Sequence, residues 1–182
     1  MEKILVVDIE TSGFSYEKDV IFEIGIVELG LNDGNITTLF DTLIREPHLS
    51  AKHREAWIFS NSDMTPEMVR SAPKIEDVRL EAQRIFDGYE GMTAFNRNFD
   101  FGFLLHRNFK LPKPLPCPML LSTDILKLPN KNGPGYKWPS AQEAWNYYFP
   151  DFPYQEKHRG ADDARIEAMI IYQMFKREIF KV

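Results

Sequence analysis

The feature that most constrains the fold is an apolar run close to the N-terminus. The run from Ile4 to Ile9 is rich in β-branched residues and contains one acid, Asp8, a composition that predicts a buried strand. A second strand is predicted from Val20 to Leu31. The Asp-Gly turn within residues 32–35 then leads into a third strand from Ile36 to Arg45. The chain is therefore expected to open with three antiparallel strands.

The later segments predict helices that alternate with two further strands. Apolar residues have helical spacing in Pro66–Ser71 and Ile75–Tyr89. The elements expected next are a short strand (Met92–Asn96), a helix (Phe99–Asn108) and an extended proline-rich stretch (Leu111–Pro118). A fifth strand (Leu120–Leu126), a helix capped by its first residue (Ser140–Tyr148) and a last helix (Gly160–Arg177) are expected to follow. This order predicts an α/β fold with a mixed five-stranded sheet flanked by helices.

Length and composition narrow the class of protein. The chain has 182 residues, 43% hydrophobic and 27% charged, which predicts one globular domain over residues 1–182. Its single cysteine, Cys117, excludes a disulfide framework and is expected to be inert. No stretch approaches the ~20 apolar residues of a membrane span, and the apolar run near the N-terminus is too short for a signal peptide. We therefore expect a cytoplasmic protein that does not contact a membrane.

The charge is unevenly distributed. The net charge is -5, whereas proteins that bind nucleic acids are usually basic. Between Arg107 and Gln142, however, six residues are basic and only Asp124 is acidic. An acidic total also fits a site in which carboxylates surround metal cations, so the charge neither supports nor excludes a nucleic-acid partner.

Two carboxylates stand at the end of the first predicted strand. Asp8 and Glu10 are two residues apart, and residues i and i+2 of a strand point to the same face. Carboxylates beside an apolar core are costly unless they are paired or bind a metal, and a divalent cation would relieve their mutual repulsion. Taken alone, the pair also fits two exposed acids at a strand-loop junction.

Two further places carry acidic side chains. Asp100 lies in the first turn of a predicted helix, directly after a predicted strand, where an acid also simply complements the helix dipole. His158 lies before the last predicted helix and Asp163 lies in its first turns. A histidine can accept a proton from water near neutral pH, although the segment also fits an ordinary acidic helix start.

Together these places supply four carboxylates and one imidazole. Phosphodiester hydrolysis with two metal ions needs such a set. The two ions lie about 3.5–4 Å apart, where one activates water and the other stabilises the leaving oxygen. Phosphoryl transfer needs positioning and charge neutralisation more than covalent work by the protein. His158 would deprotonate the attacking water.

The motifs resemble those of the DEDDh 3'→5' exonucleases, which have the ribonuclease H-like fold and include the proofreading subunit of bacterial DNA polymerase III and oligoribonuclease. The first motif spans residues 8–14 and the second spans residues 96–100. In the third motif Asp163 follows His158 by five residues, the spacing that marks the histidine subclass. The resemblance runs from residue 8 to residue 163, and residues 64–73 resemble the family's connection into its first helix.

The resemblance implies an enzyme that removes nucleoside 5'-monophosphates from the 3' end of single-stranded DNA or RNA. Asp8, Glu10, Asp100 and Asp163 would hold two Mg²⁺ or Mn²⁺ ions, and His158 would be the general base. Among the residues implied for substrate binding, Thr11 would meet the terminal 3'-hydroxyl through its backbone amide and Phe14 would wedge against the last base. The others, Asn96 and Phe99, would line the same cleft. A DNA polymerase or another replication or repair protein is an open possibility as a partner.

The chain departs from the family at two places that border the substrate in relatives. Phe95 stands where many members have histidine, and Ser62-Asp63 stands where the family often has His-Gly. These departures leave substrate choice open. The family spacing favours Asp163 over its neighbour Asp162, which is then expected to face solvent.

The remaining histidines and the late aromatic residues carry no such motif. We expect surface or loop positions for His48, His53 and His106. We expect the rings of Tyr136, Trp138 and Trp145 to pack the last loop against the core, the alternative being that Tyr136 or Trp138 contacts a single strand.

Two competing functions remain open. One is a nuclease-like module that binds nucleic acid or a polymerase without cutting, which would not need all five of the proposed catalytic residues. The other is a ribonuclease H-type endonuclease, against which Phe14 and the segment from Asn96 to Phe99 favour recognition of an end.

Overall fold

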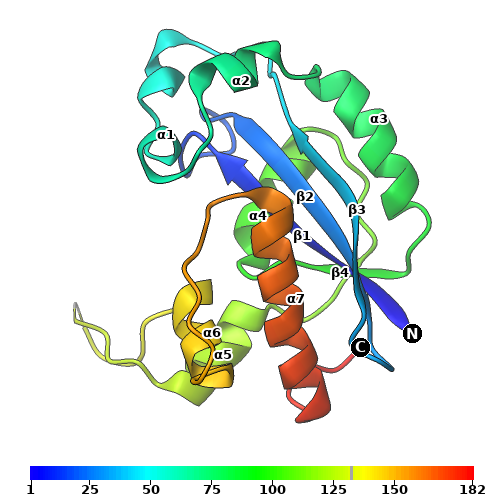
Figure 1. Cartoon of the computed structure of the whole chain (residues 1–182), viewed down its shortest axis with the longest axis vertical. Helices are drawn as coiled ribbons and strands as arrows, with labels where there is room; N and C mark the ends of the chain where they lie inside the picture. The colour runs from blue at the N-terminus through cyan, green and yellow to red at the C-terminus, as the bar shows by residue number, and fades with distance from the viewer. Residues whose placement is uncertain (132) are drawn as a thin grey trace.

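The computed structural model describes residues 1–131 and 133–182 and is built on a five-stranded mixed sheet (Figure 1). The strands, in chain order, are β1 (Lys3–Thr11), β2 (Ile21–Gly30), β3 (Ile36–Leu43), β4 (Gly91–Thr93) and β5 (Lys113–Pro114). Their order across the sheet is β3-β2-β1-β4-β5, with β1, β2 and β3 antiparallel and β4 and β5 parallel to β1. The predicted α/β fold, with three antiparallel strands first, is confirmed.

Helices cover both faces of this sheet. In chain order they are the 3-10 helix η1 (Ala51–Glu55) and the α-helices α1 (Ile58–Asn61), α2 (Pro66–Ser71), α3 (Ile75–Phe86), α4 (Arg97–His106), α5 (Pro118–Leu126), α6 (Ala141–Tyr148) and α7 (Gly160–Lys176). Figure 1 shows α7 lying along one face of the sheet, while α1 and α2 gather at the end of the sheet where β3 finishes. Within the described residues, no helix is long and apolar enough to cross a membrane.

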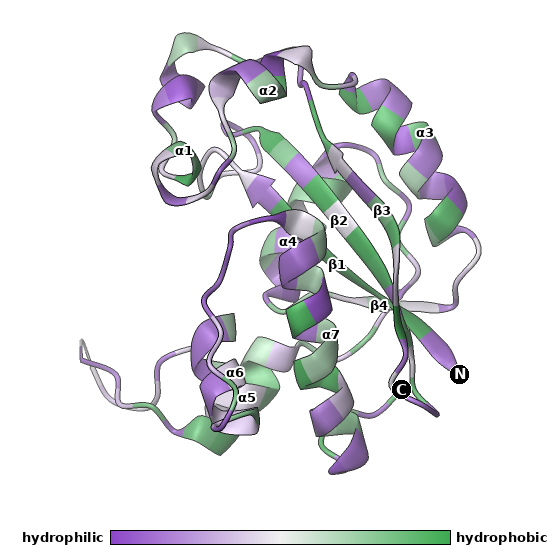
Figure 2. Cartoon of the chain, in the orientation of Figure 1, coloured by the Kyte–Doolittle hydropathy of each residue, from purple (hydrophilic) through white to green (hydrophobic). Residues whose placement is uncertain are grey.

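Strand β1 divides the interior into two cores because its side chains alternate between the faces. Ile4 and Val6 pack with residues of α5, α6 and α7. Leu5, Val7 and Ile9 pack with residues of α3 and α4. Figure 2 shows the hydrophobic colour along β1 and β2, whose apolar side chains are fully or almost fully buried. Asp8 and Glu10 follow the alternation of Ile4 and Val6 and so belong to the face that α7 covers.

The prediction of the fifth strand was wrong in its position. Residues 118–126 form helix α5, and the fifth strand is the two-residue β5 in the proline-rich stretch that was predicted to be extended. Short apolar runs fit either a strand or a helix. Pro118 at the first helical position starts α5, where a missing N–H costs nothing.

Several side chains differ from their predicted environment. His53 is buried in η1, and its ring forms hydrogen bonds with Ser50 and the Lys18 carbonyl, because η1 packs beneath the loop that follows β1. Tyr136 and Trp138 are 48% and 66% exposed, so only Trp145 packs against the core as predicted. Asn132, which lies between the predicted strand Leu120–Leu126 and the predicted helix Ser140–Tyr148, is outside the described residues.

Candidate active site

The first two acids of the site lie on β1. Asp8 pairs with Gly25 of β2 and Glu10 pairs with Glu23, both in antiparallel register. A buried strand holds their backbones rigidly, and the β1–β2 register shifts only after Glu10. The two carboxylates are therefore presented side by side toward the face covered by α7.

The third acid enters from α4. Strand β4 runs parallel to β1, so the two strands end at the same edge of the sheet, and α4 begins four residues after β4 ends. Asp100 lies in the first turn of α4 and is 4% exposed. Its Oδ1 accepts a hydrogen bond from the Ile9 N–H at 3.3 Å. Because Ile9 lies between Asp8 and Glu10 in the chain, this bond places Asp100 directly beside the two acids of β1.

The fourth acid is brought to β1 by a backbone contact between α7 and β2. A Cβ atom on Gly25 would lie 2.0 Å from the carbonyl carbon of Gly160, and one on Gly160 would lie 2.7 Å from the Gly25 nitrogen. Two backbone segments can approach this closely only where both residues at the contact are glycine. Because Gly25 is the cross-strand partner of Asp8, this contact sets the start of α7, and with it Asp163, beside the acids of β1.

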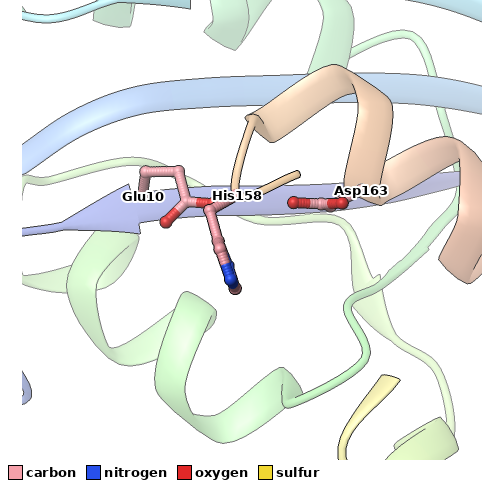
Figure 3. Close-up of side chains that lie close together, drawn as sticks. All are labelled: Glu10, His158 and Asp163. Atoms are coloured by element: carbon pink, nitrogen blue, oxygen red, sulfur yellow. The ribbon is translucent and has the colours of Figure 1, made fainter. Parts of the chain in front are cut away.

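Glu10, His158 and Asp163 converge in space. One ligand atom from each lies within 4.8 Å of the others. Figure 3 shows the three side chains close together. Asp163 is 4% exposed; its carboxylate accepts hydrogen bonds from the Tyr154 hydroxyl at 2.5 Å and the Arg159 N–H at 2.9 Å. The candidate acids and the candidate base thus meet at one end of the sheet, although they come from segments far apart in sequence.

The segment around His158 is anchored by an ion pair that the sequence analysis missed. Arg159 binds the carboxylate of Glu23, with Nη2 at 2.7 Å and Nε at 3.0 and 3.1 Å from its oxygens, and also binds Asp63 at 2.7 Å. Glu23 is 1% exposed and also accepts a hydrogen bond from the Gly160 N–H. These bonds hold His158 in a left-handed conformation (φ 56°) that few non-glycine residues adopt.

Burial makes the negative charges of the site expensive. It raises the pKa of Glu10 to about 9, with the charge of Asp163 as the next cause. It raises the pKa of Asp100 to about 7. The pKa of Asp8 is also raised well above its ordinary value, first by burial and then by the charge of Glu167. Without a bound cation, these buried groups therefore keep their protons to a higher pH than ordinary carboxyl groups do.

The donor set fits divalent cations. The Oδ2 atom of Asp8 is buried and has no hydrogen-bond partner among the described residues. A buried carboxylate oxygen without a partner is rare in native proteins and points to an ion or water. Carboxylate oxygens are the ligands that Mg²⁺ and Mn²⁺ prefer.

A fifth acid, Glu167, faces the same region and was not predicted. It lies one helical turn after Asp163 on α7 and is 5% exposed. Burial raises its pKa, and the charge of Asp100 adds to the rise. Its spacing of four residues from Asp163 was the available sign, because residues i and i+4 share a helix face.

Aromatic side chains border the acidic centre. Phe14, in the loop after β1, is 92% exposed and meets the ring of Phe99 edge-on at 6.2 Å. Trp57 is 60% exposed and meets the His158 ring edge-on at 4.8 Å. No local pattern marks Trp57, because it lies between the predicted strand that ends at Arg45 and the predicted helix that begins at Pro66.

The other implied substrate residues lie at the ends of the same elements. Thr11 ends β1, and its hydroxyl donates a hydrogen bond to the Gly13 carbonyl at 2.7 Å. Asn96 precedes α4 as its N-cap residue, with its carbonyl accepting from the Phe99 N–H at 2.8 Å. Asp162 is exposed and pairs with Lys157 at 3.0 Å, so its predicted solvent position is confirmed.

Sequence comparisons place the whole site inside one family match. The RNase_T family, described as exonuclease, matches residues 5–171. A DNA polymerase III PolC-type protein of Clostridium perfringens is 30% identical over 179 residues, which are 97% of this chain and 11% of that protein. A PolC-type protein of Bacillus subtilis is 32% identical over 103 residues, 57% of this chain and 7% of its own. The chain spans about a tenth of the length of such relatives.

Solved structures share the fold. The nuclease domain of 3'hExo, a DEDDh family member bound to rAMP, has a TM-score of 0.70 at 16% identity and covers 100% of this chain and 96% of its own. Escherichia coli exonuclease I, in a zinc-bound complex with single-stranded DNA, has a TM-score of 0.74 at 11% identity over 98% of this chain and 41% of its own. The family match covers most of the chain, and the solved structures share its fold: the chain belongs to the RNase_T exonuclease family.

Proposed function

We propose that this hydrolase removes nucleoside 5'-monophosphates from the 3' end of single-stranded DNA or RNA with the help of two Mg²⁺ or Mn²⁺ ions. Asp8, Glu10, Asp100 and Asp163 hold the ions, and His158 is the general base. The observation that carries the proposal is the convergence of Glu10, His158 and Asp163 within 4.8 Å. It is supported by the buried Oδ2 of Asp8, which has no hydrogen-bond partner among the described residues.

The proposed site residues have two roles: the carboxylates provide negative charge for the ions, and His158 transfers a proton. When bound, the two ions supply activation of water and stabilisation of the leaving oxygen. The carboxylates on β1, α4 and α7 fix where positive charge sits, since each is set by a strand or a first helical turn. His158 accepts the proton of the attacking water, and its ring is steered by the edge-on contact with Trp57 and by the bonds of Arg159.

The exposed aromatic rings suit an unpaired strand. Stacking on an aromatic ring tolerates any base and contributes about 1–3 kcal/mol per base. We propose that Phe14 and Phe99 contact the terminal base from one side of the acidic centre and that Trp57 contacts it from the side of His158. Thr11 at the end of β1 and Asn96 at the start of α4 complete the proposed binding site for the 3' end. Recognition of an end favours an exonuclease over an endonuclease on the same fold.

The test is the release of mononucleotides from single-stranded oligonucleotides. Uniformly labelled DNA and RNA strands would be incubated with Mg²⁺, Mn²⁺ or EDTA, and the products resolved by chromatography. We expect nucleoside 5'-monophosphates with either metal and none with EDTA. Nucleoside 3'-monophosphates, or no product from folded protein with either metal, would contradict the proposal, and the latter would favour the binding-module alternative.

A DNA polymerase is the partner class that we propose, since the curated relatives are PolC-type DNA polymerases. Co-elution of the purified chain with the replicative polymerase of its own source on size exclusion would support this. Independent elution at micromolar concentrations would indicate a free enzyme.

A further inference from the structure

Glu167 is a buried carboxylate that the proposed mechanism does not use. It lies on α7 four residues after Asp163, and both side chains point to the face that covers β1. Glu167 is 5% exposed, and it is flanked by Ala164 and Ala168, which are fully buried. A carboxylate in this position costs free energy unless the structure compensates it.

The hydrogen bonding of Glu167 links α7 to the turn that carries the third acid. Its Oε2 accepts a hydrogen bond from the Phe95 N–H at 3.2 Å. Phe95 directly precedes Asn96, the N-cap of α4, and Asp100 lies in the first turn of that helix. The bond therefore fixes the path of the chain between β4 and α4, from which Asp100 enters the site.

Within the part of the chain that the structure describes, no basic side chain neutralises Glu167. Of the ion pairs found among residues 1–131 and 133–182, none includes it. The charges that act on it are the acids Asp100, Asp163 and Glu156, and its own charge is the strongest of those acting on Asp8. One backbone N–H does not offset a buried negative charge among other negative charges, whereas a nearby divalent cation does.

We propose that Glu167 is a positioning residue of the metal centre, which fixes the turn before α4 through Phe95 and contributes a fifth negative charge that strengthens cation binding. This inference rests on the proposed function. Residues that orient or polarise metal ligands typically change metal affinity by roughly 10- to 100-fold when they are replaced. Glu167 would then have two separable roles, as an acceptor for the Phe95 N–H and as a negative charge.

Two substitutions separate these roles in the full chain. Glu167→Gln keeps an oxygen acceptor for Phe95 and removes the charge. Glu167→Leu removes both. The matched control is Asp162→Asn, which makes the same change in net charge on the same helix at an exposed position next to Asp163. Mn²⁺ binding would be measured by titration calorimetry without nucleic acid, and thermal unfolding would be measured in EDTA.

We expect Glu167→Gln to weaken Mn²⁺ binding by roughly 10-fold or more, with Tm in EDTA equal to or higher than that of the parent. We expect Asp162→Asn to bind Mn²⁺ as the parent does. Glu167→Leu should weaken binding at least as much and lower the Tm in EDTA, because the Phe95 N–H loses its partner.

Two results would overturn the inference, and they are distinguishable. If Glu167→Gln binds Mn²⁺ like the parent, the charge has no role at the metal centre and Glu167 is only a backbone acceptor, while the proposed function stands. If the parent itself binds no Mn²⁺, the proposed metal chemistry fails and this inference fails with it.

Discussion

At the scale of single residues, two adjacent aspartates at the start of α7 have opposite environments. Asp163 is 4% exposed and accepts hydrogen bonds from Tyr154 and Arg159. Asp162 is exposed and pairs with Lys157 on the surface. A helix turns by about 100° per residue, so neighbours in sequence point to different sides of α7. Only Asp163 reaches the acids of β1.

This difference predicts unequal effects of the same chemical change. We expect Asp163→Asn to abolish hydrolysis, since it removes a charge that faces Glu10 within the converging group. We expect Asp162→Asn to retain most of the parent rate, because exposed ion pairs contribute little. Rates on a 5'-labelled strand would be compared at saturating Mg²⁺. An active Asp163→Asn beside an inactive Asp162→Asn would reject the choice of Asp163.

His158 gives a second prediction at this scale. We expect His158→Ala to lower the rate by roughly 10²–10⁴, the usual contribution of a general base. Mn²⁺ affinity measured by calorimetry should be largely kept, because the proposed metal ligands are the four carboxylates and not the imidazole. The pH-rate profile of the variant should lose the limb that the base contributes. Identical profiles for variant and parent would remove His158 from proton transfer, and a loss of Mn²⁺ binding would make it a ligand instead.

The sequence predicts the members of this centre better than it predicts what holds them. Asp8, Glu10 and Asp100 could be predicted as candidates, because each stands at the end of a predicted strand or the start of a predicted helix. Glu23 and Arg159 were not, since their ion pair joins β2 to the start of α7 across more than a hundred residues. No local pattern marks two residues that meet only in the folded chain.

At the scale of elements, the contact between β2 and α7 determines the geometry of the site. Gly25 and Gly160 bring the two backbones together, and Gly25 lies opposite Asp8 in the sheet. The Arg159–Glu23 ion pair and the bond from Gly160 N–H to Glu23 close the same junction. The junction therefore places Asp163 beside β1 and also orients the loop that carries His158.

We expect Gly25→Ala to damage this junction. The new Cβ would lie 2.0 Å from the Gly160 carbonyl carbon, so β2 and α7 would have to move apart. Overpacking typically costs about 1–3 kcal/mol, and a clash with backbone belongs at the upper end of that range. Denaturant unfolding would measure the loss of stability, and Mn²⁺ titration would measure the loss of binding.

Gly133→Ala is the matched control, because a Cβ there would meet nothing within 4 Å. It should leave stability and Mn²⁺ binding close to those of the parent. If Gly25→Ala were as stable as Gly133→Ala and bound Mn²⁺ equally well, the close approach of β2 and α7 would not be needed for the site.

The elements themselves were largely predictable, with one informative exception. The hairpin turn at Asp33-Gly34 and the helix cap at Ser140 are local signatures, and the structure contains both. Residues 120–126 were predicted as a strand because they are apolar, and they form helix α5 instead. The decisive signs were Pro118 at the first helical position and the packing of α5 in the core with α6 and α7, of which only the first is local.

At the scale of the whole molecule, the buried acids link stability to pH and to metal ions. The pKa of Glu10 is raised from 4.5 to about 9, and that of Asp100 from 3.8 to about 7. Between its ordinary and raised pKa, each group binds more protons in the folded than in the unfolded chain. The free energy of unfolding without metal therefore falls as pH rises through these windows.

We expect the metal-free protein in EDTA to have a lower Tm at a pH of about 8 than at a pH of about 5. Because the ligands must be deprotonated to bind metal, the gain in Tm on adding Mg²⁺ or Mn²⁺ should be larger at the higher pH. Thermal unfolding at the two pH values, with and without metal, measures both effects. Equal gains at both pH values would contradict the assignment of these carboxylates to a metal centre.

The fold class of the whole chain was predictable because three strands and their turn are local patterns and the motifs follow in order. The net charge of -5 was uninformative, since it combines buried acids of the site with exposed acids that have no role there. Which charges belong to the site depends on burial, and burial follows from packing between distant segments.

The proposed activity is tested most directly on a sequencing gel that follows the shortening of a 5'-labelled single strand with Mg²⁺ and with EDTA. The Asp163→Asn variant is assayed in parallel. A circular strand of the same sequence serves as the substrate without an end. We expect a ladder that shortens one nucleotide at a time from the 3' end of the linear strand. We expect no cutting of the circle and no ladder in EDTA or with the variant. Internal cuts in the circle, or a ladder that persists with EDTA or with Asp163→Asn, would contradict the proposed activity.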